Sequence, residues 1–284
     1  MSAPPLFRIA DARRISVVRD IAQVQQVFDE DPVGTCMVAA RVGDHGLDPV
    51  TIGGELWTRN RPADSLCFAG VNLVPMRGTT TDMMVFADKV VSAPRRCSSL
   101  VGRAELVLPM WQQLVPSWGP AREVRDCQPL LTLTEAPRCP IDAAVRQVRM
   151  DELDAYLVAA VEMFIGEVGV DPRIGDGGRG YRRRLAALIA SGRAWARFEH
   201  GRVVFKAEIG AQTAQVGQIQ GVWVHPDWRG RGLGLAGTAT LASAVLHSGR
   251  IASLYVNDFN VPARATYRRI GFTQVGTFAT VLLD

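Results

Sequence analysis

The chain has 284 residues, of which 48% are hydrophobic and 21% are charged, so it has enough apolar surface for one large or two ordinary water-soluble domains. No stretch approaches the roughly 18 consecutive apolar residues of a membrane-spanning helix, and no early apolar run has signal-peptide length. The net charge of +4 comes from scattered arginines rather than from a basic patch. We therefore expect no membrane or nucleic-acid partner, and we expect a cytoplasmic location.

The first 140 residues alternate between helical and extended patterns, and they hold all five cysteines. Helical spacing of apolar residues predicts helices at 21–28, 36–42, 82–91 and 109–115, and short apolar runs predict strands at 54–58, 65–73, 99–101 and 129–133. This order repeats in the second half, which favours a degenerate copy of one fold. An odd number of cysteines without a CxxC pair is typical of reduced thiols, and no metal site is expected.

A proline-containing segment at 132–140 is the best linker candidate, and it predicts two domains, residues 1–140 and 141–284. In the second domain the patterns predict a strand at 144–149, helices at 151–165 and 181–190, a hairpin of strands 194–199 and 203–209, and a strand at 214–224. A loop between the two helices, 166–180, is rich in Gly and Asp and contains Glu167.

The stretch 218–237 reads QIQGVWVHPDWRGRGLGLAG and joins a strand to a helix through several glycines. The strand ends at Val224, and the helix is rich in Ala and Leu and runs to about residue 246. The first N–H groups of a helix lack intrahelical partners and carry partial positive charge, and glycines let the backbone approach a bulky anion. The strand end, the arginines of the loop and the helix start therefore predict a pyrophosphate site.

Two ligand templates match this loop. Gly232, Gly234 and Gly237 satisfy the dinucleotide pattern GxGxxG, whereas Arg229, Gly232 and Gly234 satisfy the (Arg/Gln)-x-x-Gly-x-(Gly/Ala) pattern of acyl-CoA binders. A dinucleotide fold needs its first glycine directly at the strand end, yet seven residues separate Val224 from Gly232, and too few residues follow Gly237 for several further parallel strands. We favour acyl-CoA and leave open a nicotinamide dinucleotide or a tight connection without a ligand.

Further along the chain, Asn260 and Ala263 follow a strand at 254–256, and Tyr267, Gly271 and Phe272 come after them at fixed spacing. Together with the glycine loop, these positions make residues 217–272 resemble the core of the GNAT superfamily of acyl-CoA-dependent N-acyltransferases. The resemblance implies an α/β (α+β) fold of tandem GNAT-like domains, each a mixed, mostly antiparallel sheet flanked by helices, with a splayed parallel strand pair in the C-terminal domain. In the first half, residues 71–78 lack the Gly-x-Gly of the loop, so that half is expected to be structural or acceptor-shaping.

The resemblance also implies how individual residues would bind acetyl-CoA, the expected cosubstrate. Backbone groups of the strand end, Val222, Trp223 and Val224, would hold the pantetheine arm and the thioester. The loop would hold the pyrophosphate through Arg229, Gly230, Arg231, Gly232, Leu233 and Gly234. Asn260 would bind the pantetheine amide. Tyr267 would protonate the leaving thiolate, because a tyrosine with a pKa of about 10 is a proton donor at neutral pH.

The sequence leaves the general base unassigned, because Gln218 stands where many relatives have a glutamate. Glutamine cannot accept a proton at neutral pH. A water chain or another carboxylate, such as Glu167 or Glu208, takes the proton of the amine, or the amine arrives already neutral. We expect His225, at the turn before Pro226, to be structural.

The expected function is transfer of an acetyl group from acetyl-CoA to a primary amine by direct attack in a ternary complex. The alternative is an acyl-CoA-binding regulator or pseudoenzyme, which the missing glutamate favours and Tyr267 disfavours. No motif identifies the acceptor, which can be a small molecule or a protein amine, and the oligomeric state is open.

Overall fold

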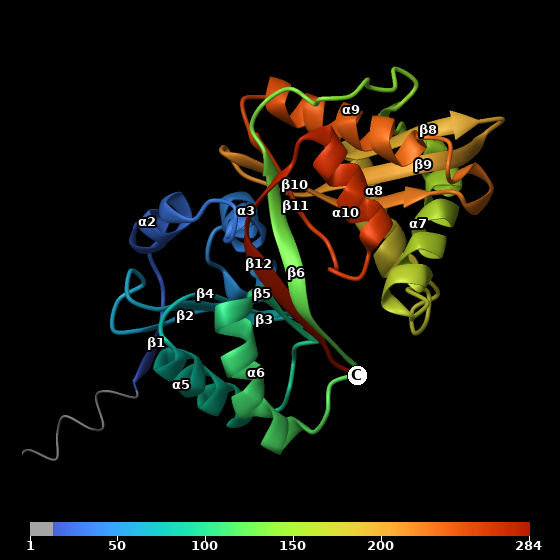
Figure 1. Ribbon diagram of the computed structural model, residues 1–284. Helices are drawn as coiled ribbons and strands as arrows, with labels where there is room; N and C mark the ends of the chain where they lie inside the picture. Colours follow the sequence, from blue (N-terminus) through green and yellow to red (C-terminus); the bar gives the residue numbers. More distant parts are fainter. Residues whose placement is uncertain (1–13) are drawn as a thin grey trace, which may run out of the picture. The chain divides into compact units, whose positions relative to one another are not determined.

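The computed structural model describes residues 14–284, and the chain divides into two units (Figure 1). The first unit contains the chain up to Leu130 together with the final segment, Val275–Asp284. The second unit is Leu131–Gln274. The division therefore comes before the linker that the sequence predicts, and the end of the chain belongs to the first unit. The assignment of domains to residues 1–140 and 141–284 stays a prediction.

The first unit is built on a mixed sheet with the strand order β1-β2-β3-β4-β5-β12-β6. Its strands are β1 (Ile15–Val17), β2 (Gly54–Arg59), β3 (Leu66–Gly70), β4 (Leu73–Arg77), β5 (Ser99–Arg103), β6 (Glu123–Leu133) and β12 (Thr273–Leu282). The strands β1 to β4 pair antiparallel, β4 and β5 are parallel, and β12 is antiparallel to β5. The single strand predicted at 65–73 is two strands, because the chain turns at Val71 and Asn72.

Helices of the first unit confirm the predicted helical segments. They are α2 (Ala22–Glu30), α3 (Cys36–His45), the short α4 (Pro49–Ile52), α5 (Thr80–Val91) and α6 (Ala104–Trp118). Helix α6 begins at Ala104 rather than at residue 109. Phe86 of α5, Met110 of α6 and Leu100 of β5 are fully buried in one apolar cluster. The same cluster holds Cys67 and Cys97, and burial raises the pKa of the Cys97 thiol to about 11, as expected for the free, reduced thiols that the structure has.

The backbone amides at the start of helix α5 are hydrogen-bonded by side chains of a capping box. Thr79 N donates to Asp82 Oδ2 at 2.8 Å, Asp82 N donates to Thr79 Oγ1 at 3.3 Å, and Arg59 Nη1 donates to Asp82 Oδ1 at 2.8 Å. This capping box uses backbone amides that would otherwise be available to an anion. The first unit thus has no open helix start after β4, where the sequence lacks the second Gly-x-Gly.

We expect Asp82→Ala to lower the free energy of unfolding by about 1–2 kcal/mol, because the variant loses the acceptor of the Thr79 amide and leaves the partly buried Arg59 without the Asp82 carboxylate. Urea denaturation followed by circular dichroism measures the change. Asp88→Ala, an exposed change on the same helix, is the control and should stay within about 0.5 kcal/mol of the parent. Equal losses in the two variants would contradict the role of the capping box.

The second unit has a sheet with the order β11-β10-β9-β8-β7, in which β10 and β11 are parallel and the other pairs are antiparallel. Its strands are β7 (Arg146–Gln147), β8 (Ala194–Glu199), β9 (Arg202–Gln212), β10 (Val216–Val224) and β11 (Ile251–Tyr255). Its helices are α7 (Leu153–Val168), α8 (Arg179–Ala190), α9 (Leu233–His247) and α10 (Val261–Ile270), with short 3-10 turns at Met150–Glu152 and Pro226–Trp228. These elements confirm the predicted order, although the strand predicted at 144–149 is only two residues long.

The sheet of the second unit has an apolar face and a polar face, because side chains alternate along each strand. The apolar face packs against α9 and includes Phe205, Ala207, Ile209, Ile219 and Leu254. The opposite face carries a row of polar side chains, here called the polar row: Lys206, Glu208, Gln218, Gln220 and Ser253. All of them except Gln220 are buried, and Tyr156 of α7 and Arg184 of α8 reach Glu208 there. This face positions the candidate site.

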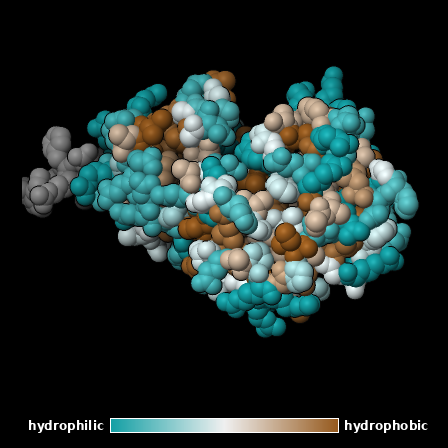
Figure 2. Space-filling view, turned by 90° about the horizontal axis from the view of Figure 1, so that it is seen from above, coloured by the Kyte–Doolittle hydropathy of each residue, from teal (hydrophilic) through white to brown (hydrophobic). Residues whose placement is uncertain are grey.

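The molecular surface mixes hydrophilic and hydrophobic residues. On the face shown in Figure 2, hydrophobic residues occur in separate groups among hydrophilic ones. Among the described residues, no helix combines the length and the apolar character that crossing a bilayer requires.

Candidate functional site

A bulge interrupts β10 just before its end. Gln220 pairs with Glu208 of β9, but the next pairing joins Trp223 to Lys206, so β10 holds one extra residue there. Gly221 in the bulge has φ +59°, in the left-handed region where a side chain is strained. A Cβ at Gly221 would lie 3.1 Å from both Lys206 Nζ and Met163 Sδ. The bulge is therefore packed directly against the polar face of the unit.

The parallel strands β10 and β11 are paired over a short distance only. The pairing begins with Val216 opposite Ile251 and ends with Gln218 opposite Ser253. The remainder of β10, which contains Val222, lies beyond this ladder, so its edge toward β11 is not occupied by strand pairing within the described residues. This is the splayed parallel pair that the sequence predicts, and it leaves backbone groups available to an extended ligand.

The glycine loop joins β10 to α9 with its amides uncovered. Gly230 has φ +75° and Gly232 has φ +82°, and a Cβ at either position would meet no atom within 4 Å. Gly232 is the N-cap of α9, and no side chain caps this helix. Arg229 Nε donates to Val224 O at 3.2 Å, which holds the loop to the strand end, and the Arg231 guanidinium lies 5.0 Å from the centre of the Trp228 ring. The loop combines open space, an uncapped helix start and two cations, which suits a pyrophosphate.

Two further residues of the loop and helix serve packing. Leu233 is buried at the start of α9. A Cβ at Gly237 would lie 2.7 Å from the Phe205 ring, so Gly237 is needed for close contact between α9 and β9. The third glycine of the apparent GxGxxG pattern is thus explained by helix–sheet packing and not by a ligand.

Asn260 and Tyr267 both belong to α10. Asn260 is its N-cap, and its Oδ1 accepts a hydrogen bond from Ala263 N at 3.2 Å. Tyr267 is 7% exposed and packs edge-on against Phe272, with 5.9 Å between ring centres. Burial raises the pKa of Tyr267, and the negative charge of Glu167 raises it further, so the phenol stays protonated at neutral pH. Its state is that of a proton donor.

Glu208 is surrounded by donors on the polar face. Oε1 accepts from Lys206 Nζ at 2.9 Å and from Tyr156 at 3.2 Å, and Oε2 accepts from Arg184 at 3.3 Å and from Gln220 at 3.5 Å. Burial raises the pKa of Glu208, but the charges of Lys206 and Arg184 outweigh burial and lower the pKa to about 2. A carboxylate in this state binds a proton weakly, which makes Glu208 a poor general base near pH 7.

Glu167 and Gln218 complete the candidate residues. Glu167 is exposed near the end of α7, and its charge raises the pKa of both Tyr267 and Tyr181, so the structure brings Glu167 and Tyr267 into one region. Gln218 is 1% exposed, and its Nε2 has no hydrogen-bond partner. Ser253, its register partner on β11, also has a buried hydroxyl without a partner.

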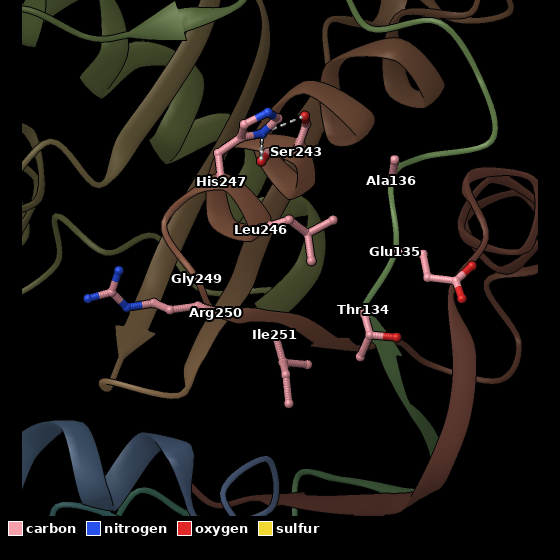
Figure 3. Close-up of a pocket in the computed structure, with 9 residues that line it drawn as sticks. All are labelled: Thr134, Glu135, Ala136, Ser243, Leu246, His247, Gly249, Arg250 and Ile251. Carbon is pink, nitrogen blue, oxygen red and sulfur yellow. Dashed lines mark hydrogen bonds between the residues drawn. The ribbon is translucent and has the colours of Figure 1, made fainter.

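A pocket of about 390 Å³ lies elsewhere in the second unit (Figure 3). Its lining includes Ser243 and His247 from the last turns of α9, and His247 Nδ1 lies 2.7 Å from Ser243 O. None of the glycine-loop residues lines it. The C-terminal end of a helix carries partial negative charge, which disfavours a pyrophosphate there, so we place the anion site at the other end of α9.

Family comparisons agree with this geometry. Residues 204–281 match the family described as FR47-like protein, and residues 54–156 match a domain of unknown function, DUF4081. No curated protein is significantly similar to the chain in sequence. An acetyltransferase of the GNAT family from Colwellia psychrerythraea has a similar structure, with a TM-score of 0.57 and 12% identity, covering 95% of this chain and all of that one. The chain therefore has the fold of this GNAT-family acetyltransferase.

Two other solved structures are similar to the chain. A Drosophila protein gives a TM-score of 0.66 at 12% identity and covers 95% of this chain and 98% of its own. A GCN5-related N-acetyltransferase from Kribbella flavida gives a TM-score of 0.53 at 15% identity, with 87% and 96% covered. At such identities the likeness shows the fold, and the chemistry of the chain follows from its own residues.

Sequence reasoning missed several residues of the polar face: Lys206, Tyr156, Arg184 and Ser253. One signal was available, because Lys206 and Glu208 alternate with apolar residues in β9 and therefore share a face of the strand. The contributions of α7 and α8 had no such signal, since they depend on how the helices of the GNAT fold pack on the sheet.

Proposed function

We propose that the chain is an N-acyltransferase that moves an acetyl group from acetyl-CoA to a primary amine by direct attack in a ternary complex. The observation that carries the proposal is the uncapped start of α9, reached from the splayed end of β10 through Gly230 and Gly232. The contrast within the molecule supports it, because the start of α5 is closed by Thr79 and Asp82. Only the second unit thus offers, among the described residues, an open helix start after such a loop.

The loop and the strand end would bind acetyl-CoA in two parts. The pyrophosphate would accept hydrogen bonds from the first amides of α9 and would lie near Arg229 and Arg231. The pantetheine arm would follow the open edge of β10 at Val222–Val224, in the manner of an added strand, with Asn260 at its other side. This arrangement would place the thioester beside the bulge at Gly221.

Tyr267 would act when the thioester is attacked. The amine nitrogen forms a bond to the carbonyl carbon, and the C–S bond then breaks and releases the thiolate. The thiolate takes the phenolic proton of Tyr267, and the proton lost by nitrogen restores the phenol. The buried phenol is protonated, as this role requires.

The second candidate function is an acyl-CoA-binding regulator without transfer activity. The ion-paired state of Glu208, together with an amide at Gln218, favours it, because neither residue takes a proton readily. Release of CoA thiol in the presence of a panel of amines distinguishes the two functions. Tight acetyl-CoA binding without thiol release for any amine would favour the regulator.

We expect Tyr267→Phe to lower kcat by about 100-fold, because the variant keeps the ring packing on Phe272 but loses the proton donor. Affinity for acetyl-CoA should stay unchanged by calorimetry. Tyr255→Phe, a matched change on β11, serves as the control. A Tyr267→Phe enzyme with parental kcat would contradict the general-acid role.

A further inference from the structure

Glu208 is one of the two carboxylates that could take the proton of the amine, but it forms a structural ion pair with Lys206. Its side chain is 2% exposed, and donors from β9, β10, α7 and α8 occupy both of its oxygens. A carboxylate held in this way gives up several hydrogen bonds if it takes a proton.

The neighbouring part of the polar row is neutral and unsatisfied. Gln218 and Ser253 form the last paired rung of β10 and β11, immediately before the two strands separate. Both side chains are at least 99% buried, and Gln218 Nε2 and Ser253 Oγ have no hydrogen-bond partner. Buried polar groups are nearly always hydrogen-bonded, so two adjacent unsatisfied groups at the splay indicate a place for a polar ligand group.

We propose that the acceptor is a weakly basic amine, such as an α-amine next to a carbonyl group, that reacts in its uncharged form, and that the neutral pair Gln218 and Ser253 receives this form. The proposal rests on the proposed function and adds the acceptor class. An alkylammonium ion would instead require a carboxylate counter-ion, because burying an unpaired charge is costly.

Proton balance supports an uncharged amine. A neutral primary amine brings two protons on nitrogen and loses one of them during the reaction. The thiolate takes a proton from the phenol of Tyr267, and the proton lost by nitrogen then replaces it. The reaction needs no net proton acceptor. An ammonium ion brings one more proton, which must leave for a base in every turnover.

Several charged or titratable groups lie on the polar row or act on it. Lys206 and Glu208 belong to the row, Tyr156 on α7 and Arg184 on α8 contact Glu208, the charge of Glu208 acts on Tyr181 of α8, and the charge of Glu167 on α7 acts on Tyr181 and on Tyr267 of α10. The tyrosines have raised pKa values, with that of Tyr181 raised to about 12 by burial and by Glu208. Glu167 is the competing base, and the experiment below includes it.

The test compares two acceptors of similar size, glycinamide and n-butylamine, by CoA thiol release. With amine pKa values of about 8 and about 10.4, the uncharged fractions at pH 7 differ by about 230-fold. We expect kcat/KM at pH 7 to be more than about 10-fold higher for glycinamide, even though the weaker base is the weaker nucleophile. Equal values, or a preference for n-butylamine, overturn the proposal.

The pH profiles give a second readout. We expect kcat/KM for glycinamide to level off near pH 8, at the acceptor's own pKa, and kcat/KM for n-butylamine to keep rising to about pH 10. Profiles that level off together at one pH would indicate an enzyme base. If Glu167→Gln then removes that shared step, Glu167 is the base and the proposal is overturned.

Two variants test the neutral pair. Ser253→Ala should raise KM for glycinamide by about 3–10-fold, while acetyl-CoA affinity and Tm stay at parental values, because the hydroxyl has no protein partner to lose. Ser243→Ala, a change at a half-buried serine near the C-terminal end of α9, is the control and should leave KM for glycinamide at the parental value. A purely structural hydroxyl would lower Tm and leave KM unchanged.

Gln218→Glu should raise kcat/KM for n-butylamine and reduce the preference for glycinamide.

Failure of this proposal is distinguishable from failure of the proposed function. If acetyl-CoA does not bind in calorimetry, the acyltransferase itself is wrong and the acceptor class fails with it. If acetyl-CoA binds and n-butylamine is the better acceptor, the enzyme stands and only the acceptor class is overturned.

Discussion

Gly232→Glu should abolish measurable binding of acetyl-CoA while the protein remains folded. The variant puts a carboxylate at the N-cap of α9, where the open loop would receive the pyrophosphate. Like charges at a distance of about 4 Å repel by several kcal/mol near a protein surface, which corresponds to a loss in affinity of more than about 100-fold. Isothermal titration with acetyl-CoA measures the affinity, and circular dichroism confirms folding.

Gly249→Glu is the matched control for this change. Gly249 follows the C-terminal end of the same helix, has φ +77°, and leaves a Cβ free of contacts within 4 Å, as Gly232 does. Both variants therefore carry a similar cost of placing a side chain in the left-handed region, about 1 kcal/mol. Only Gly232→Glu should lose acetyl-CoA. Parental affinity in Gly232→Glu, or equal losses in both variants, would remove the loop from the binding site.

The second half of the fold could be predicted because its signals are local. Alternation in β9, the glycine loop, and the Asn260 to Phe272 spacing each depend on a few adjacent residues, and the structure has the corresponding strand, loop and helix. The path of the last strand could not be predicted in this way. Residues 275–284 belong to the first unit, where 278–282 pair with β5, and the partner of a strand depends on contacts remote in sequence.

The candidate site shows the same limit. The glycines and Tyr267 were identified from spacing, and Gln218 was recognised as an unusual residue at its position. The state of Glu208 could not be predicted, because it depends on Lys206 two residues away and on Tyr156 and Arg184, which arrive from helices far along the chain. A pKa follows from such packing and not from the residue type alone.

The buried pair Lys206 and Glu208 leads to the largest expected effect on stability. Lys206 is fully buried, and besides Glu208 its ammonium contacts Met163 Sδ at 3.4 Å and the Tyr156 ring at 5.3 Å. We expect Lys206→Met to lower the free energy of unfolding by about 3–5 kcal/mol at pH 7, because it leaves the Glu208 charge buried without its main partner. Urea denaturation measures the loss. Lys89→Met removes the only other lysine, an exposed one, and should cost no more than about 0.5 kcal/mol.

A double variant and the pH dependence identify the cause. Lys206→Met combined with Glu208→Gln should recover about half of the loss or more, because no buried charge remains. In the parent, the pKa of Glu208 is lowered from 4.5 to about 2, so its contribution is fully present above about pH 4.5 and is lost as the pH falls toward 2. In Lys206→Met the nearer of the two cations that lower the pKa of Glu208 is gone, while the burial that raises this pKa remains. We therefore expect the pKa of Glu208 to rise above its unfolded-state value in spite of Arg184, so that the native state takes up a proton more readily than the unfolded state. Lowering the pH from 7 to 5 should therefore shrink the deficit of Lys206→Met, and a deficit that stays constant over this range would show that lost packing, rather than an unpaired charge, is its cause.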